Sequence, residues 1–267
     1  MSAISLIVVV YNQSVGSVPA IQEAIRSDSG MEIVVCDNST CENNNAALSE
    51  ELGLCYVDME GNKGLSAAYR AGVERCRGEV VCLFDDDTQV KEDYFTAVRN
   101  LDASSKSWDV ALPLVMSGDS VLSPCLFNGY RARQFTEAGF VADCPELSGI
   151  NSGMVIKRSL FDAVQHDTSL FLDLIDHQFI SDVKRVGGKI VYLRGPVLKQ
   201  SYSFTTDNVD NALNRLLIFE RDARHFYKDT LPRRMYCGGM LVGRKIKLCL
   251  KYRTARFLNP TRYVREA

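Results

Sequence analysis

The sequence predicts an α/β protein, a Rossmann-like sandwich with a mostly parallel central sheet, followed by a basic helical appendage at the C-terminus. Two observations support this. In the first half, short continuous apolar segments alternate with helix-length segments, which is typical of parallel strands covered by helices on both faces. In addition, ten Lys or Arg residues and only one acidic residue follow position 232, although the whole chain has a net charge of −2.

The elements of the first half follow one another without repeats. The apolar segments predict strands at 4–10, 32–36, 54–57 and 80–84, and apolar residues at helical spacing predict helices at 15–26, 43–52 and 65–76. A further helix is expected to start near Lys91. Right-handed crossovers bring the carboxyl ends of such strands to one edge of the sheet, where ligands bind.

The second half is less regular. Strands are expected at 108–115, at 149–156 with Ser152 and Gly153, and at 190–193, with a loop-rich stretch at 116–147. Helices are expected at 169–186 and at 207–227, the latter capped by Asp207.

Composition excludes several classes of protein. The chain has 267 residues, of which 46% are hydrophobic and 24% charged, as in ordinary soluble proteins and unlike disordered or collagenous chains. No apolar run reaches membrane-spanning length, and the N-terminus lacks the charged start of a signal peptide. Nine scattered cysteines without a CxxC pair favour reduced thiols in the cytoplasm over disulfides or a zinc site.

Asp85, Asp86 and Asp87 directly follow the strand predicted at 80–84. Three adjacent carboxylates at a buried strand end repel one another unless a cation neutralises them. Oxygen ligands at positions i and i+2 suit a hard divalent ion such as Mg²⁺ or Mn²⁺. The alternative is a solvated acidic turn that caps the next helix.

Two further strand ends are polar. Asp37 either forms a turn before the helix at 43 or accepts from the imide N–H of a uracil or thymine base. Gly61, Asn62, Lys63 and Gly64 precede a helix, so they form either an ordinary turn or a loop whose amides approach an anion.

Asp173 and Asp176 form the acidic pair of the second half. Their spacing places both on one helical face or at a helix start, where they either cap the helix or supply a general base.

These motifs in order resemble glycosyltransferase family 2. VVVYN, VVCDNST, GNKGLSAAYRAG, VVCLFDDDTQV, a Ser-Gly strand and LFLDLID carry the resemblance, which covers residues 4–195. It implies a GT-A fold, and the likeness is strongest to a bacterial rhamnosyltransferase-like branch. It also implies a domain over 1–230, with a nucleotide-binding half at 1–115 and an acceptor half at 116–230, before a basic tail at 231–267.

The resemblance implies a role for each matching residue. Asp176, with Asp173 beside it, falls on the catalytic base, and Asp85 and Asp87 fall on the metal site. The donor-binding set comprises Tyr11, Asp37, Asn62, Lys63, Gly64, Asp85, Asp86, Ser152 and Gly153. Two positions depart from the family: Gln178 stands where a second acid is common, and Gln200-Ser201 stands where a histidine is common.

The implied function is inverting transfer of a sugar from dTDP-rhamnose or a UDP-sugar to a glycan or lipid-linked acceptor in cell-surface polysaccharide synthesis, with Mg²⁺ or Mn²⁺ as cofactor. A non-catalytic nucleotide- or glycan-binding protein on the same fold is the alternative. A nucleotidyltransferase would be expected to have a phosphate-binding loop rich in glycine and basic residues directly after the first strand. It is disfavoured because VVVYNQSVG lacks the basic residues.

The basic segment at 233–265 alternates cations with apolar residues. It could lie on an anionic membrane, pack on the acidic body or form an oligomer contact, although its glycines weaken a long helix. No motif for nucleic acid is present. We expect a cytoplasmic protein, with peripheral attachment to the inner face of the plasma membrane left open.

Overall fold

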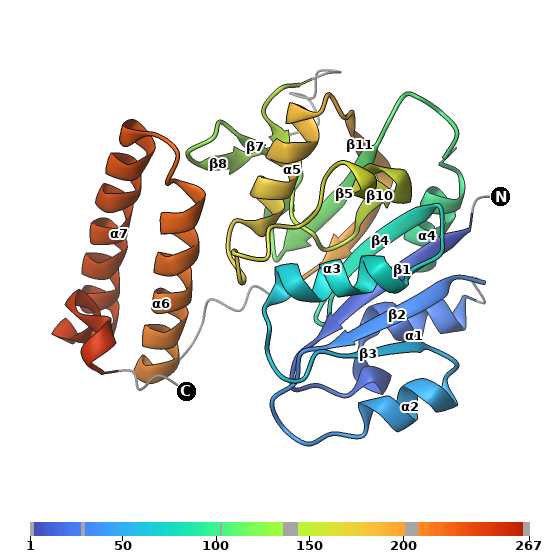
Figure 1. Ribbon diagram of the computed structural model, residues 1–267, viewed down its shortest axis with the longest axis horizontal. Coiled ribbons are helices and arrows are strands. Elements are labelled where there is room, and N and C mark those ends of the chain that lie inside the picture. The colour runs from blue at the N-terminus through green and yellow to red at the C-terminus, as the bar shows by residue number, and fades with distance from the viewer. Residues whose placement is uncertain (1–2, 28–29, 102, 136–143, 201–207, 264–267) are drawn as a thin grey trace. The chain divides into compact units, whose positions relative to one another are not determined.

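The computed structural model describes residues 3–27, 30–101, 103–135, 144–200 and 208–263. Its main feature is an eight-stranded sheet in the order β11-β5-β10-β4-β1-β2-β3, with β6 paired to β5 (Figure 1). The strands are β1 (Ile4–Val10), β2 (Glu32–Asp37), β3 (Cys55–Asp58), β4 (Val80–Asp85), β5 (Val110–Ser117), β6 (Ser120–Ser123), β10 (Met154–Lys157) and β11 (Ile190–Lys199).

Most neighbouring strands of this sheet are parallel. The pairs β1–β2, β1–β4, β2–β3 and β5–β11 are parallel, whereas β10 runs antiparallel to β4 and β5 and β6 runs antiparallel to β5. The predicted fold class, α/β with a mostly parallel sheet, is therefore confirmed. A second, three-stranded sheet joins β8 (Ala132–Gln134), β7 (Cys125–Phe127) and β9 (Leu147–Ser148).

Helices cover both faces of the main sheet, which explains why its strands are continuously apolar. Leu6, Val8 and Val10 of β1 share a core with α1 (Pro19–Arg26) and α4 (Glu92–Arg99), while Ile7 faces α3 (Leu65–Arg75), so all seven residues of β1 are buried. Gly72 lets α3 come close, because a Cβ there would lie 2.4 Å from Ile7 Cγ2. The helices of the chain are α1 (Pro19–Arg26), α2 (Asn45–Glu51), α3 (Leu65–Arg75), α4 (Glu92–Arg99), α5 (Ile175–Arg185), α6 (Val209–Phe226) and α7 (Leu231–Tyr252).

Three predictions for the second half need correction. The strand expected at 149–156 begins only at Met154, so Ser152 and Gly153 lie in the preceding turn, where Gly153 has a φ of 77°. The helix expected from 169 begins at Ile175, because Leu174 has a φ of 64° and cannot continue a helix. The stretch at 116–147, expected to be loop-rich, contains β6, β7 and β8 within its described part.

The chain divides into two compact units. The first unit is Met1–Thr168 with Asp176–Ser201, and the second unit is Ser169–Ile175 with Tyr202–Ala267. The second unit therefore includes α6 as well as the basic segment, whereas the sequence placed a boundary at 230. Asn208 caps α6 by accepting from the Asp210 amide, and the predicted cap, Asp207, lies outside the described residues.

The basic segment forms a 22-residue helix, α7, in spite of Gly238, Gly239 and Gly243. α6 and α7 lie side by side as an antiparallel pair (Figure 1). Packing against α6 offsets the low helix propensity of the glycines, so the helical appendage is confirmed. Within the described ranges, no helix has both the length and the apolar character needed to cross a membrane.

Candidate active site

The carboxyl end of β4 is the centre of the candidate site. Asp85 accepts hydrogen bonds from the Tyr69 hydroxyl at 2.7 Å, from the Ser152 hydroxyl at 2.6 Å and from Gln200 Nε2 at 3.1 Å. These donors come from α3, from the turn before β10 and from the residue after β11. Segments far apart in the chain therefore converge on one carboxylate.

The two following carboxylates have different surroundings. Asp86 Oδ2 accepts from the Tyr11 amide at 2.9 Å, which links the ends of β1 and β4. Asp87 Oδ1 accepts from Gln200 Nε2 at 3.2 Å, so one amide nitrogen bridges Asp85 and Asp87. Burial raises the pKa of Asp86, and burial together with the charge of Asp85 raises the pKa of Asp87 to about 6. The negative charge at this strand end is thus only partly compensated.

These groups fit a divalent cation that shares its coordination with a substrate. No set of three or more His, Cys, Asp or Glu side chains in the described ranges is arranged to hold a metal. However, Mg²⁺ is commonly bound by one or two carboxylates, with the remaining positions filled by water and phosphate oxygens. Asp85 and Asp87 supply two such carboxylates, and the buried Oε1 of Gln200 has no hydrogen-bond partner in the described structure.

Asp176 lies in the first turn of α5, where its Oδ1 accepts from the His177 amide at 2.8 Å. The His177 ring is stacked on Phe127 at 4.2 Å, and its Nδ1 lies 2.8 Å from Ser148 Oγ, so the start of α5 is firmly held.

Tyr69 is a buried residue of α3 whose hydroxyl contacts the acidic strand end. Burial, followed by the charges of Asp85, Asp86 and Asp176, raises the pKa of this phenol well above its usual value. Tyr69 was missed in the sequence, where only its place on the apolar face of GNKGLSAAYRAG could have indicated an inward side chain.

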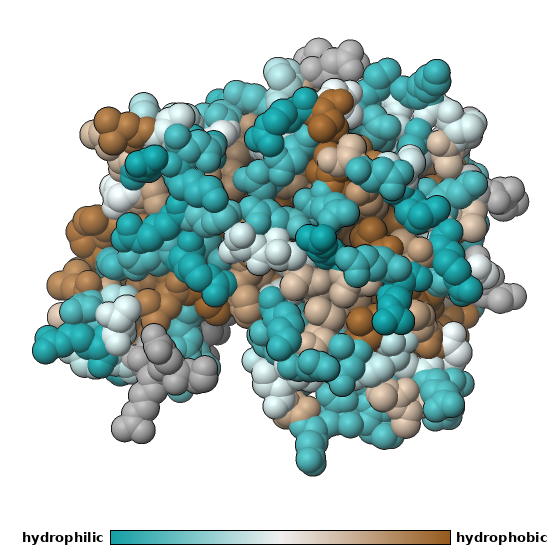
Figure 2. All heavy atoms as spheres, viewed as in Figure 1, coloured by the Kyte–Doolittle hydropathy of each residue, from teal (hydrophilic) through white to brown (hydrophobic). Residues whose placement is uncertain are grey.

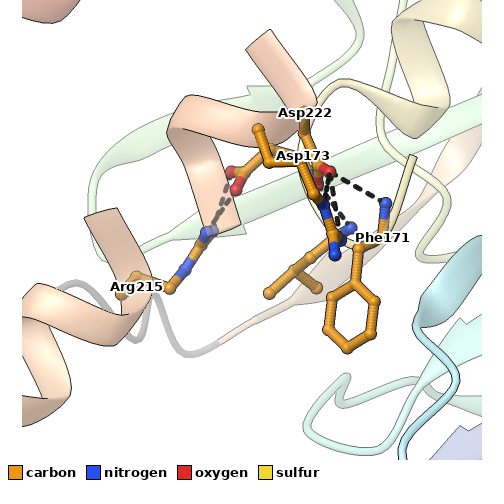
Figure 3. A network of polar contacts seen from close by, with 6 residues as sticks. Phe171, Asp173, Arg215 and Asp222 are labelled. Atoms are coloured by element: carbon orange, nitrogen blue, oxygen red, sulfur yellow. Dashed lines mark hydrogen bonds and ion pairs between the residues drawn. The ribbon is translucent and has the colours of Figure 1, made fainter. Parts of the chain in front are cut away.

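Asp173 has a different environment within the second unit. Arg215 of α6 binds its carboxylate with two hydrogen bonds, one of them 2.7 Å between Nη2 and Oδ1 (Figure 3). Asp173 precedes α5, so the two acids do not share a helical face as one prediction had it. The ion pair occupies the Asp173 carboxylate, and its catalytic role stays a prediction.

A fully buried carboxylate, Asp222, holds the segment that contains Asp173. It accepts from the amides of Phe171, Leu172 and Asp173 at 3.1, 2.8 and 2.9 Å (Figure 3). Because three consecutive amides bind this side chain, Asp222 fixes the backbone of the segment that precedes α5.

At the end of β2, Asp37 forms the predicted turn. It accepts from the Ser39 amide at 2.9 Å, from Asn45 Nδ2 at 2.9 Å and from the Tyr56 hydroxyl at 3.0 Å. Burial raises the pKa of Asp37, but these hydrogen bonds outweigh it and keep the pKa below the usual value. The carboxylate is therefore ionised and rigid; its contact with a base stays a prediction.

The glycine-containing loop is joined to the same strand end by a residue to which the sequence gave no role. Asn38, which is buried, accepts from the Lys63 amide at 3.2 Å and donates to the Gly64 carbonyl at 3.2 Å. Asn62 and Lys63 are exposed, while Gly64, with a φ of 89°, caps α3. The predicted donor-binding residues of the first half thus lie at the ends of β1, β2 and β4 or in the loop after β3.

The sheet and its polar strand ends define an α/β protein of the kind in which ligands bind beyond the carboxyl ends of the strands. Residues 5–111 match the family model for Glycosyl transferase family 2, so this part of the chain is similar to that family. The resemblance seen in the sequence is confirmed over these residues, and it supports a GT-A sandwich. The rhamnosyltransferase-like branch stays a prediction.

Among solved structures, the chain is similar to the crystal structure of S. aureus TarS, with 15% identity and a TM-score of 0.49. The similarity covers 83% of this chain and 40% of that one, so the present chain spans about two fifths of that protein's length. No curated protein matches the chain.

Proposed function

We propose that this protein transfers a sugar from a nucleotide-diphosphate sugar to a glycan or lipid-linked acceptor, with inversion at the anomeric carbon. The observation that supports it most is the convergence of the Tyr69, Ser152 and Gln200 side chains on the Asp85 carboxylate. Burial and the Asp85 charge raise the pKa of the Tyr69 hydroxyl, and the charges of Asp86 and Asp176 add to this, which supports a metal-diphosphate site facing a general base.

In this proposal Asp176 is the general base. It takes the proton from the acceptor hydroxyl while the acceptor oxygen bonds to the anomeric carbon, and the bond from that carbon to the diphosphate breaks, releasing a nucleoside diphosphate. Tyr69, Ser152 and Gln200 hold Asp85 in a fixed orientation. Asp85 and Asp87 would hold Mg²⁺ or Mn²⁺, which when bound neutralises charge on the leaving diphosphate.

Donor recognition is proposed for the first half of the chain. Tyr11, which is 48% exposed, and the ionised Asp37 would flank the base. Asn62, Lys63 and Gly64 would approach the ribose and diphosphate, with the exposed Lys63 side chain supplying positive charge. Ser152 and Gly153 would lie beside the sugar. dTDP-rhamnose and UDP-sugars are the donors to test.

The test begins with thermal-shift measurements on a panel of UDP- and dTDP-sugars with Mn²⁺, since a ligand of the native state stabilises it. With the donor found, Asp176→Asn is expected to lower turnover about 10²–10⁴-fold while donor binding is retained. The matched control is Asp182→Asn on the same helix. The Asp182 carboxylate pairs with Arg185, so its substitution should leave turnover unchanged. If Asp176→Asn keeps near-normal turnover, Asp176 is not the general base.

A non-catalytic binding protein is the second candidate, and one observation favours it. Gln200 bridges Asp85 and Asp87 with its amide nitrogen, at a position where the family commonly has a histidine. Donor binding without transfer or hydrolysis, with Mn²⁺ present and a panel of glycan acceptors, would establish this alternative.

A further inference from the structure

One face of α7 is packed and the opposite face is not. Cys237 and Leu241 are buried, and Leu248 and Tyr252 pack against the small core that α6 contributes to the second unit. Arg244 lies 3.8 Å from the Phe219 ring centroid, and Lys245 pairs with Glu220 at 2.9 Å. These contacts fix the rotation of α7 about its axis, and therefore fix which side chains face away from α6.

The side that faces away is apolar. Its large side chains are between 49% and 74% exposed, and steps of four and seven residues place them in one stripe along the helix. They are Leu231, Met235, Val242, Ile246 and Leu250. We call these five residues the α7 stripe.

The glycines of α7 are on the same side as the stripe. Gly238, Gly239 and Gly243 have no atom within 4 Å of where a Cβ would stand, so nothing in the described structure covers them. Figure 2 shows apolar side chains among hydrophilic ones over the region of α7. An exposed apolar stripe of this length is typical of an interaction surface.

The charge of the second unit indicates the partner. Its described residues include thirteen Lys or Arg and five Asp or Glu. All five carboxylates take part in ion pairs. Asp173 pairs with Arg215, Asp210 with Arg256, Glu220 with Arg224 and Lys245, Asp222 with Arg221, and Asp229 with Arg233. Arg234, Lys247, Lys251 and Arg253 of α7 and its C-terminal end have no carboxylate partner in the described chain. The stripe is therefore accompanied by uncompensated positive charge.

We propose that the α7 stripe docks on an anionic phospholipid membrane, with α7 lying in the plane of the interface. The apolar side chains would enter the boundary between headgroups and acyl chains, and the cations beside them would lie at the lipid phosphates. Pairing of the stripe with a second copy would bring like charges together, and nucleic acid would leave the apolar side chains exposed. This inference is independent of the proposed chemistry of the first unit.

Flotation of the full chain with vesicles tests the proposal. Binding is expected on vesicles of phosphatidylcholine mixed with phosphatidylglycerol, and much weaker binding on phosphatidylcholine alone. The triple variant Val242→Ser, Ile246→Ser, Leu250→Ser is expected to lower the partition coefficient at least about 100-fold, because each side chain loses its transfer into the interface. Lys247→Glu with Lys251→Glu should lower it at least about 10-fold.

The matched control is Ile25→Ser, an exposed apolar residue of α1 that should leave flotation unchanged. Circular dichroism establishes that each variant keeps its helices. Equal flotation of the triple variant and the natural chain overturns the proposal, as does equal binding to both kinds of vesicle. It is also overturned if sedimentation finds a dimer that the triple variant loses, since a second copy would then occupy the stripe.

Discussion

His166 provides a stability prediction whose size follows from the structure. The ring is buried, stacked on Phe179 at 4.6 Å and 5.4 Å from Tyr69, and neither ring nitrogen has a partner in the described structure. Burial lowers its pKa from 6.5 to about 3, so the folded protein keeps this ring neutral where the unfolded chain protonates it. The associated stability is present above pH 6.5 and is lost as the pH falls toward 3.

The loss amounts to about 1.4 kcal/mol for each pH unit below 6.5, or about 2 kcal/mol at pH 5. His166→Phe keeps an aromatic ring between Phe179 and Tyr69 and removes the titration. We therefore expect the free energy of unfolding of the natural chain to fall by about 2 kcal/mol more than that of the variant between pH 7 and pH 5. At pH 7 alone, the sign of the stability difference between the variant and the natural chain is not informative. Removing two buried polar atoms stabilises the fold, whereas adding volume in a packed core destabilises it.

The assay is urea unfolding at several pH values, followed by the fluorescence of Trp108. This is the only tryptophan of the chain, and it is buried in the same unit as His166. His225→Gln, in the second unit, serves as the control and should follow the natural chain. Parallel pH curves for His166→Phe and the natural chain would refute the reasoning, since the buried ring would then not be held neutral.

Two other substitutions should change stability by amounts that the contacts define. Gly153→Ala is expected to cost about 2–4 kcal/mol in thermal unfolding, because φ is 77° and a Cβ would lie 2.5 Å from Leu198 Cδ2. Its control, Gly118→Ala, has a φ of 55° and open space around the new Cβ, so it should cost only about 1 kcal/mol. Equal losses of stability would contradict the steric argument. Asp222→Asn should lower the free energy of unfolding by about 1–3 kcal/mol, since an amide cannot accept from all the backbone groups that the carboxylate binds. Its control, Asp229→Asn, removes an exposed ion pair and should cost less than about 1 kcal/mol. A larger loss for Asp229→Asn than for Asp222→Asn would refute the role given to Asp222.

Where both faces of an element are buried, the pattern of residues was sufficient. β1 begins and ends as predicted, at Ile4 and Val10, because a strand covered on both faces must be apolar at every position. The acidic end of β4 was also visible in the sequence, since the chain turns polar where the buried strand ends. Its three adjacent aspartates gave the strongest indication of a site.

Contacts between distant residues could not be predicted in this way. The segment before α5 is held by Asp222, which accepts from amides 49 to 51 positions earlier in the chain, and residues 169–174 carry no local mark of it. Asp85 likewise takes its donors from Tyr69, Ser152 and Gln200, which only the fold brings together. Periodicity records which side chains are buried, because burial follows from one element's own residues. It does not record which polar groups meet, because hydrogen bonds join single atoms of separate elements, and their pairing is decided only when those elements pack.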